Sequence, residues 1–87
     1  MKSKLTRLQA ISLLIKELDR AEKLHPKWPS DLIHQSAIVS EESGELTRAC
    51  LNFVYHKENN LDNILEEAIH TGAMAIRFLI NLENLKE

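Results

Sequence analysis

The 87-residue sequence contains very little cysteine, glycine or proline: one cysteine, two glycines and two prolines. A single cysteine, Cys50, excludes an internal disulfide and any zinc site built from several cysteines, and it fits a reducing compartment. The scarcity of glycine and proline leaves few positions that interrupt regular structure, and strict alternation of apolar and polar residues is missing. These absences predict an all-α fold, and the length of the chain predicts a single domain spanning residues 1–87.

Long apolar runs and concentrated positive charge are also missing. No apolar run approaches the roughly 18 to 20 residues of a membrane span, and the amino terminus lacks the apolar segment and cleavage site of a signal peptide. The net charge is −2, and the 11 lysines and arginines are scattered along the chain, which argues against a DNA or RNA partner. We expect a soluble, cytoplasmic protein that binds neither nucleic acid polymers nor membranes.

Three amphipathic segments remain. The first is predicted as a helix over about 4–24, with an apolar packing stripe at intervals of three and four residues. The stripe consists of Leu5, Leu8, Ile11, Ile15 and Leu18. Both prolines lie in "HPKWPSD", after which Ser30 is the expected N-cap of a second helix that ends near His56. Asn60 is the expected N-cap of a third helix over about 61–85, which completes a three-helix chain, with room for a short extra turn.

Glutamate, in contrast, is concentrated in "SEESGELTRA", where Glu41, Glu42 and Glu45 fall within five positions. Like charges one helical turn apart repel by roughly 0.2 to 0.5 kcal/mol per pair. At about 100° per residue, Glu42 falls within the apolar stripe of the second helix, Glu45 lies about 60° away and Glu41 about 100° away. The stripe consists of Ile38, Leu46, Ala49 and Phe53. Because desolvated carboxylates need cations or hydrogen bonds, we expect a positive partner at this position.

The third helix repeats this pattern around Glu67. The core stripe beside Glu67 consists of Ile64, Met74, Phe78 and Leu82. A polar edge on its other side consists of Asn63, His70, Arg77 and Asn81. A further apolar face, roughly opposite Glu67, consists of Ile69, Ala73, Ile76 and Ile80. A helix that is apolar on two sides needs two packing partners, so we expect a second copy of the chain, as a homodimer or within a tetramer.

Antiparallel packing of the second and third helices brings the acidic residues together. Glu42, Glu45 and Glu67 then converge, with Glu41 and Glu66 beside them. Carboxylate oxygens are the ligands that Mg²⁺ and Mn²⁺ prefer, and Mg²⁺ commonly binds through a few carboxylates together with substrate phosphates. Because bound metal ions reverse the local sign of charge, an acidic site of this kind predicts a phosphate-bearing ligand.

Two acidic motifs carry a resemblance to a known family. "EESGE" at 41–45 and "EEAIH" at 66–70 are similar, in order, separation and placement on consecutive helices, to the paired motifs of the MazG-like, all-α nucleoside triphosphate pyrophosphohydrolases. The likeness extends to "HPKW" before the second helix and to "GAMAIRFL" after the second motif, so it covers about 25–82. It implies a hydrolase that converts ribo- or deoxyribonucleoside triphosphates to monophosphates and pyrophosphate.

The resemblance also implies roles for the acidic residues. Glu42 and Glu45 become metal ligands from one helix, Glu67 becomes a ligand from the next, and Glu41 becomes a further ligand or the base that activates water. The family's usual fourth ligand is an aspartate three residues after the glutamate, where this sequence has His70. Imidazole binds Mg²⁺ poorly but is acceptable to Mn²⁺, so His70 is expected to alter metal choice, to contact phosphate when protonated, or to reduce activity.

The implied mechanism is hydrolysis assisted by metal ions, in which water attacks the α-phosphorus with help from a glutamate and positive charge neutralises the departing pyrophosphate. Lys27 and Trp28 precede the second helix, where Lys27 can meet phosphate and Trp28 either stacks on the base or anchors the loop to the core. Arg77, on the polar edge with Asn81, can hold a phosphate oxygen in a fork geometry or form a surface ion pair.

Two other interpretations stay open. Glu67 and His70 have the Glu-x-x-His spacing of ferritin-like di-iron bundles, although such a site does not require the additional glutamates of "EESGE". The chain can also be a helical interaction module, or a relative of the family that binds nucleotide with weakened catalysis, and His70 is the best support for that interpretation. The sequence names neither the preferred base nor the sugar of the nucleotide.

Overall fold

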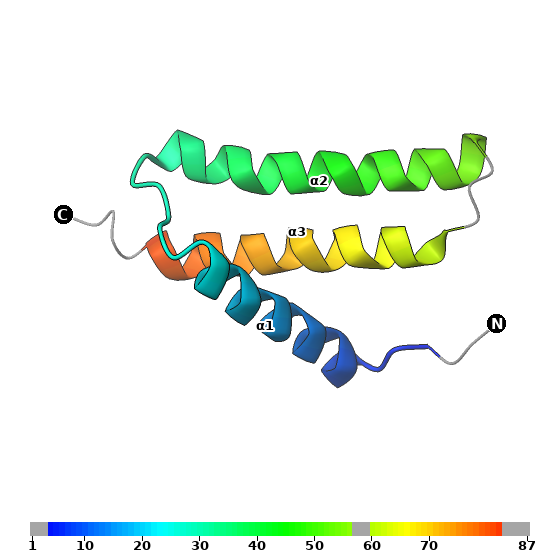
Figure 1. Cartoon of the computed structure of the whole chain (residues 1–87), viewed down its shortest axis with the longest axis horizontal. Coiled ribbons are helices and arrows are strands. Elements are labelled where there is room, and N and C mark those ends of the chain that lie inside the picture. The colour runs from blue at the N-terminus through cyan, green and yellow to red at the C-terminus, as the bar shows by residue number, and fades with distance from the viewer. Residues whose placement is uncertain (1–3, 57–59, 83–87) are drawn as a thin grey trace.

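The computed structural model describes residues 4–56 and 60–82, which form three α-helices: α1 (Arg7–Leu24), α2 (Leu32–Tyr55) and α3 (Leu61–Asn81). α2 and α3 lie side by side and antiparallel, and α1 crosses α3 obliquely (Figure 1). No strand occurs in these two ranges, so the predicted all-α fold with three helices is confirmed for them. None of these helices is long and apolar enough to cross a membrane.

Each helix is preceded by an N-cap residue whose side chain accepts a hydrogen bond from a backbone amide in the first turn of the helix. α1 starts after Thr6, later than the predicted residue 4, because Thr6 and Gln9 form a reciprocal capping box: Gln9 N donates to Thr6 Oγ1 (3.1 Å) and Thr6 N donates to Gln9 Oε1 (2.8 Å). A cap of this kind defines where the helix begins more sharply than the periodicity of the apolar residues does.

The connection that contains both prolines ends at Asp31, and the prediction of Ser30 as the N-cap of α2 is therefore wrong. Asp31 Oδ2 accepts a hydrogen bond from His34 N at 2.8 Å, and a carboxylate at this position also complements the positive end of the helix dipole. Asn60 caps α3 as predicted, since its Oδ1 accepts from Asn63 N at 3.1 Å. The predicted end of the third helix near 85 lies outside the described residues.

α1 packs on α3 through a face that differs from the predicted stripe. Leu5, Leu8, Ile11 and Ile15 are exposed, and of the predicted set only Leu18 packs against the core. Ala21 is buried instead, and Leu14 contacts α3 at Gly72. The physical reason is the oblique crossing, in which the amino-terminal half of α1 diverges from α3 (Figure 1).

Both apolar sides of α3 have partners within the same chain. Ala73, with 0% exposure, belongs to a core cluster with Ala21 of α1 and Met74, while Ile38 and Val39 of α2 pack against the same cluster. The face that contains Ala73 was expected to meet a second copy of the chain, and α1 covers part of it instead. The two apolar sides of α3 therefore do not by themselves require a dimer.

The two glycines lie in different environments, which gives a prediction for stability. Gly44 is within α2, and a Cβ added there has nothing within 4 Å, whereas a Cβ at Gly72 lies 2.7 Å from Leu14 Cδ2. Gly44→Ala is expected to raise the free energy of unfolding by about 0.5 to 1 kcal/mol, because alanine loses less backbone entropy in a helix. Urea denaturation followed by circular dichroism measures this, with Gly72→Ala as the crowded counterpart. A loss of stability in Gly44→Ala contradicts an open surface at this position.

Candidate metal centre

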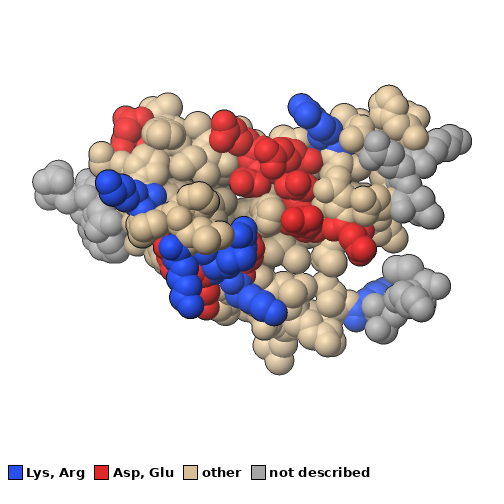
Figure 2. All heavy atoms as spheres, in the orientation of Figure 1, with Lys and Arg blue, Asp and Glu red and all other residues tan. Residues whose placement is uncertain are grey.

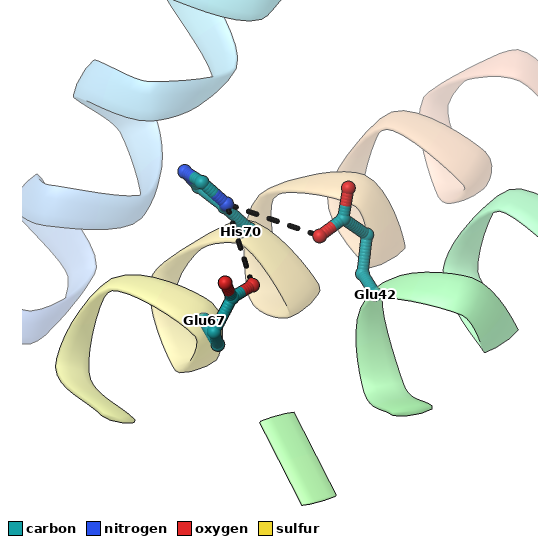
Figure 3. Close-up of side chains that lie close together, drawn as sticks. All are labelled: Glu42, Glu67 and His70. Atoms are coloured by element: carbon teal, nitrogen blue, oxygen red, sulfur yellow. Dashed lines mark ion pairs between the residues drawn. The ribbon is translucent and has the colours of Figure 1, made fainter. Parts of the chain in front are cut away.

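Three side chains from two helices converge at the middle of the α2–α3 pair. Glu42 extends from α2, and Glu67 and His70 extend from α3, with one ligand atom of each lying within 4.8 Å of the others (Figure 3). His70 Nδ1 is 3.8 Å from Glu42 Oε1 and 3.7 Å from Glu67 Oε1. Glu67 and His70 lie one turn apart on the same face of α3, and the antiparallel packing of α2 brings Glu42 to them. Three of the predicted ligands are thus brought together.

The two carboxylate oxygens that face His70 lack hydrogen bonds. Glu42 Oε1 and Glu67 Oε1 are both buried, and neither has a hydrogen-bond partner among the described residues. Burial, followed by the negative charge of Glu45, raises the pKa of both carboxyls above the ordinary glutamate value, while His70 opposes this shift. A cation held between these oxygens removes both penalties, so the pair fits a metal ion.

Glu45 and Glu41, the other glutamates of the "EESGE" motif, lie differently. Glu45 is exposed but close enough to raise the pKa of both Glu42 and Glu67, so it borders the cluster. Glu41 is also exposed and is not part of the group of three, as its position about 100° around the helix from Glu42 predicts.

Glu17 of α1 is a site residue that the sequence did not indicate. Its Oε2 lies 3.6 Å from His70 Nε2, on the opposite side of the ring from Glu42 and Glu67. Arg20 Nε and Nη2 donate to the two Glu17 oxygens at 2.8 and 2.7 Å, and this pair together with the charge of His70 lowers the pKa of Glu17 despite its burial. The sequence feature that could have indicated Glu17 was its helical phase, because Glu17 lies on the same face of α1 as Leu14 and Ala21.

A cavity of about 290 Å³ adjoins the cluster. Glu17, Glu42 and His70 contribute to its lining, together with three cations and an apolar wall. The cations are Arg20, Lys27 and Arg77, and the apolar wall includes Trp28, Ile38 and Met74. Acidic groups that fit a metal, cations that fit phosphate and an aromatic ring are therefore present around one space.

The charged side chains are separated on this face of the molecule. Figure 2 shows acidic residues in a band over the middle of α2 and α3, and basic residues gathered over the carboxy-terminal half of α1. Lys16, Arg20 and Lys23 supply basic charge to that part of α1. An anionic ligand that bridges the two regions meets cations on α1 and, with a metal ion bound, positive charge on the α2–α3 side as well.

The four residues predicted to bind substrate differ in their exposure and in the contacts that they already make within the chain. Lys27 is exposed and lines the cavity. Trp28 packs against the core cluster, as the anchoring alternative predicts, while its ring also lines the cavity and its Nε1 has no hydrogen-bond partner among the described residues. Arg77 is only 5% exposed: its Nη2 donates to the His25 carbonyl at 2.6 Å, and its guanidinium carbon lies 4.9 Å from the centroid of the Trp28 ring. Asn81 Nδ2 donates to the Arg77 carbonyl at 2.8 Å.

Comparison of the chain with known protein families, curated proteins and solved structures found no match. Two carboxylate oxygens and one imidazole nitrogen form a mixed set of hard oxygen and borderline nitrogen ligands, which suits Mn²⁺, Fe²⁺ or Zn²⁺ better than Mg²⁺.

Proposed function

We propose that this protein is a metal-dependent nucleoside triphosphate pyrophosphohydrolase that uses Mn²⁺ in preference to Mg²⁺. The convergence of Glu42, Glu67 and His70, with two buried carboxylate oxygens that lack hydrogen bonds, is the observation that carries the proposal. A divalent cation bound there supplies positive charge to phosphate oxygens and lowers the pKa of a coordinated water. The likeness of "EESGE" and "EEAIH" to the motifs of MazG-like enzymes supports the same reaction.

Different residues of the chain have different roles in the proposed reaction. Glu42, Glu67 and His70 hold the cation, and Glu45, whose charge acts on both glutamates, accepts the proton of the attacking water, with Glu41 as the more distant alternative. Lys27 and Arg20 line the cavity and contact the phosphate chain, while Trp28 offers its ring to the base. Arg77 holds the loop that carries Trp28, because it binds the His25 carbonyl and stacks on the ring.

The direct test is turnover of a panel of canonical and modified ribo- and deoxyribonucleoside triphosphates with Mg²⁺ or Mn²⁺. We expect release of pyrophosphate and the corresponding monophosphate in equal amounts, since the attacked bond is the α–β anhydride. Release of inorganic phosphate in place of pyrophosphate contradicts the reaction. Tight nucleotide binding without any hydrolysis supports the alternative of a nucleotide-binding protein with weakened catalysis.

Replacement of His70 with aspartate tests its role as a ligand. If its imidazole binds the metal, His70→Asp is expected to raise activity with Mg²⁺ relative to Mn²⁺ severalfold, because a carboxylate is the better Mg²⁺ ligand. The ratio of kcat/KM with the two metals measures this. A higher KM for every triphosphate with either metal shows instead that His70 contacts phosphate, and unchanged values leave it a structural residue.

We also propose that the chain assembles as a homodimer, on grounds different from the two faces of α3. The chain exposes 6899 Å², whereas a folded monomer of this mass exposes about 5,200 Å². Its radius of gyration is 14.6 Å, compared with about 12 Å for a monomer of this length. Leu8 and Leu79 are 76% and 62% exposed, and a predominantly apolar groove of about 540 Å³ lies between α2 and α3. A second copy that covers this groove would remove its apolar lining from water.

Replacement of Leu79 with glutamate tests this interface, because Leu79 lines the groove. Leu79→Glu is expected to convert a dimer to a monomer at micromolar concentration, since a charge in an apolar interface is left without a partner. Light scattering after size exclusion measures the mass, and Ser30→Glu, an exposed loop position, adds the same charge as a control. A wild-type protein that is monomeric at this concentration contradicts the proposal.

A further inference from the structure

The two ring nitrogens of His70 face carboxylates on opposite sides. Nδ1 faces Glu42 and Glu67 at 3.8 and 3.7 Å, and Figure 3 shows the other nitrogen pointing away from both toward α1. On that side Nε2 lies 3.6 Å from Glu17 Oε2 and 4.0 Å from Glu66 Oε2. A neutral imidazole carries one N–H and one unprotonated nitrogen, so the environment of Nε2 decides what Nδ1 presents.

Glu17 is the better-placed of the two carboxylates on the Nε2 side. The Glu17 side chain is 13% exposed, and both of its oxygens accept hydrogen bonds from Arg20, which hold the group in one orientation. Glu17 Oε2 accepts from Arg20 Nη2 and still has a second lone pair for another donor. The Glu66 side chain is 65% exposed and farther from Nε2, so it is the weaker partner.

We propose that Glu17 is a positioning residue that accepts a hydrogen bond from His70 Nε2–H and so presents unprotonated Nδ1 to the space between Glu42 and Glu67. The proposal rests on the metal centre described above, because a histidine that binds a metal through one nitrogen commonly donates the other N–H to a carboxylate, which orients the ring and raises its basicity. The Nε2–Oε2 separation of 3.6 Å exceeds the ordinary limit of roughly 3.2 Å for this bond, so the bond requires the His70 ring to move toward Glu17, whose orientation Arg20 holds.

This arrangement gives α1 a part in the chemistry of a site whose ligands come from α2 and α3. Glu17 lies across the ring from the proposed metal position, so it acts through His70 and not as a ligand. The consequence is that the contribution of Glu17 depends on an imidazole at position 70.

A double-mutant cycle on Mn²⁺ affinity tests this dependence without measuring turnover. The electron paramagnetic resonance signal of free Mn²⁺ gives the dissociation constant for the wild type, Glu17→Gln, His70→Asp and the double variant. We expect Glu17→Gln to weaken Mn²⁺ binding by about tenfold or more in the wild-type background, and by less than about twofold in the His70→Asp background. If Glu17 acted only through its negative charge, Glu17→Gln would weaken Mn²⁺ binding by the same factor in the wild-type and His70→Asp backgrounds. A larger effect in the wild-type background therefore indicates positioning through His70.

Two further variants separate geometry from charge and from folding defects. Glu22→Gln, also on α1, removes the same charge and is expected to leave Mn²⁺ affinity within about twofold of the wild type. Glu17→Asp keeps the charge but withdraws the carboxylate by one methylene, and it is expected to weaken binding, whereas an effect of charge alone leaves affinity unchanged. Proton resonances of the Zn²⁺-bound protein offer an independent measurement, since His70 Nε2–H is expected to be visible in the wild type and lost to exchange in Glu17→Gln.

The outcomes distinguish this proposal from the proposed function. If the wild type binds Mn²⁺ but Glu17→Gln loses no more affinity than Glu22→Gln, or loses the same factor in the His70→Asp background, the role of Glu17 is disproved and the metal centre stands. If the wild type binds neither Mn²⁺ nor Zn²⁺, the metal centre fails and the role of Glu17 fails with it.

Discussion

Glu67→Gln is expected to reduce pyrophosphate release from nucleoside triphosphates by at least about 100-fold while the three helices persist. The reason is that Glu67 is a proposed charged metal ligand, and loss even of a group that only orients a ligand lowers metal affinity or activity by about 10- to 100-fold. Glu42→Gln is expected to behave in the same way, because its Oε1 belongs to the same group of three ligand atoms. Turnover at saturating metal and far-UV circular dichroism are the two measurements.

Glu41→Gln is the matched comparison, since it makes the same chemical change one residue from Glu42. Its exposed carboxylate lies outside the cluster, so we expect a loss of less than about tenfold, below the full 10²- to 10⁴-fold worth of a general base. A loss as large as that of Glu67→Gln would identify Glu41 as the base in place of Glu45. Full activity in both Glu42→Gln and Glu67→Gln would disprove the metal centre itself.

In the absence of metal, Glu42→Gln and Glu67→Gln are expected to raise the stability of the fold, although both reduce turnover. Because the pKa of Glu67 is raised in the folded protein, the native state binds more protons than the unfolded state between the ordinary value of 4.5 and the raised value. The Glu67 contribution to stability is therefore lost as pH rises through this window. We expect metal-free Glu67→Gln to melt at a higher temperature than the wild type at pH 7, and Mn²⁺ to stabilise only the wild type.

Arg77→Met is expected to lower the free energy of unfolding by about 2 to 5 kcal/mol, the largest loss of stability that we predict. The change removes a hydrogen bond from a charged donor to the His25 carbonyl, worth about 1.5 to 3 kcal/mol, and a cation–π contact with Trp28, worth about 0.5 to 2 kcal/mol. It also leaves the His25 carbonyl without this donor. A domain of this size has a total stability of only about 4 to 13 kcal/mol, so this loss is a large fraction of the total.

Urea denaturation with Arg77→Met, Arg77→Lys and Arg48→Met measures this effect. Lysine keeps the charge but not the planar fork, so it is expected to fall between arginine and methionine, while exposed Arg48 is expected to change stability by less than about 0.5 kcal/mol. If Arg77→Met is as stable as the wild type, Arg77 is free to serve as the phosphate contact that its position on the polar edge of α3 suggested.

The sequence predicted the parts of the site that depend on positions within one helix. Helical phase placed Glu42 in the core stripe of α2 and put Glu67 and His70 one turn apart, and the structure brings these three residues together. The all-α class and the Asn60 cap were also predictable, because they follow from the scarcity of helix-breaking residues and from local hydrogen bonding.

What the sequence could not predict depends on how the helices cross. The apolar stripe of α1 is wide enough to allow several packing faces, and the close approach of Leu14 to Gly72 selects one that leaves Leu8 and Ile15 exposed. The same crossing brings Glu17 to His70, a contact between residues that are distant in sequence and on different helices. Periodicity determines which residues share a face, but not which neighbouring helix that face meets.

The unequal packing of the helices has a consequence for the order in which the structure opens. α2 and α3 form an extended antiparallel hairpin, whereas α1 is held chiefly by α3 through a short crossing around Gly72 and Ala73. Local opening of α1 can therefore occur while the hairpin stays folded, at a free energy below that of global unfolding. Glu42, Glu67 and His70 would remain together in that partly open form, while Glu17 and the cations of α1 depart. Such a state keeps the three proposed metal ligands and loses the α1 cations that are proposed to contact phosphate, so opening of α1 would change access to the proposed site.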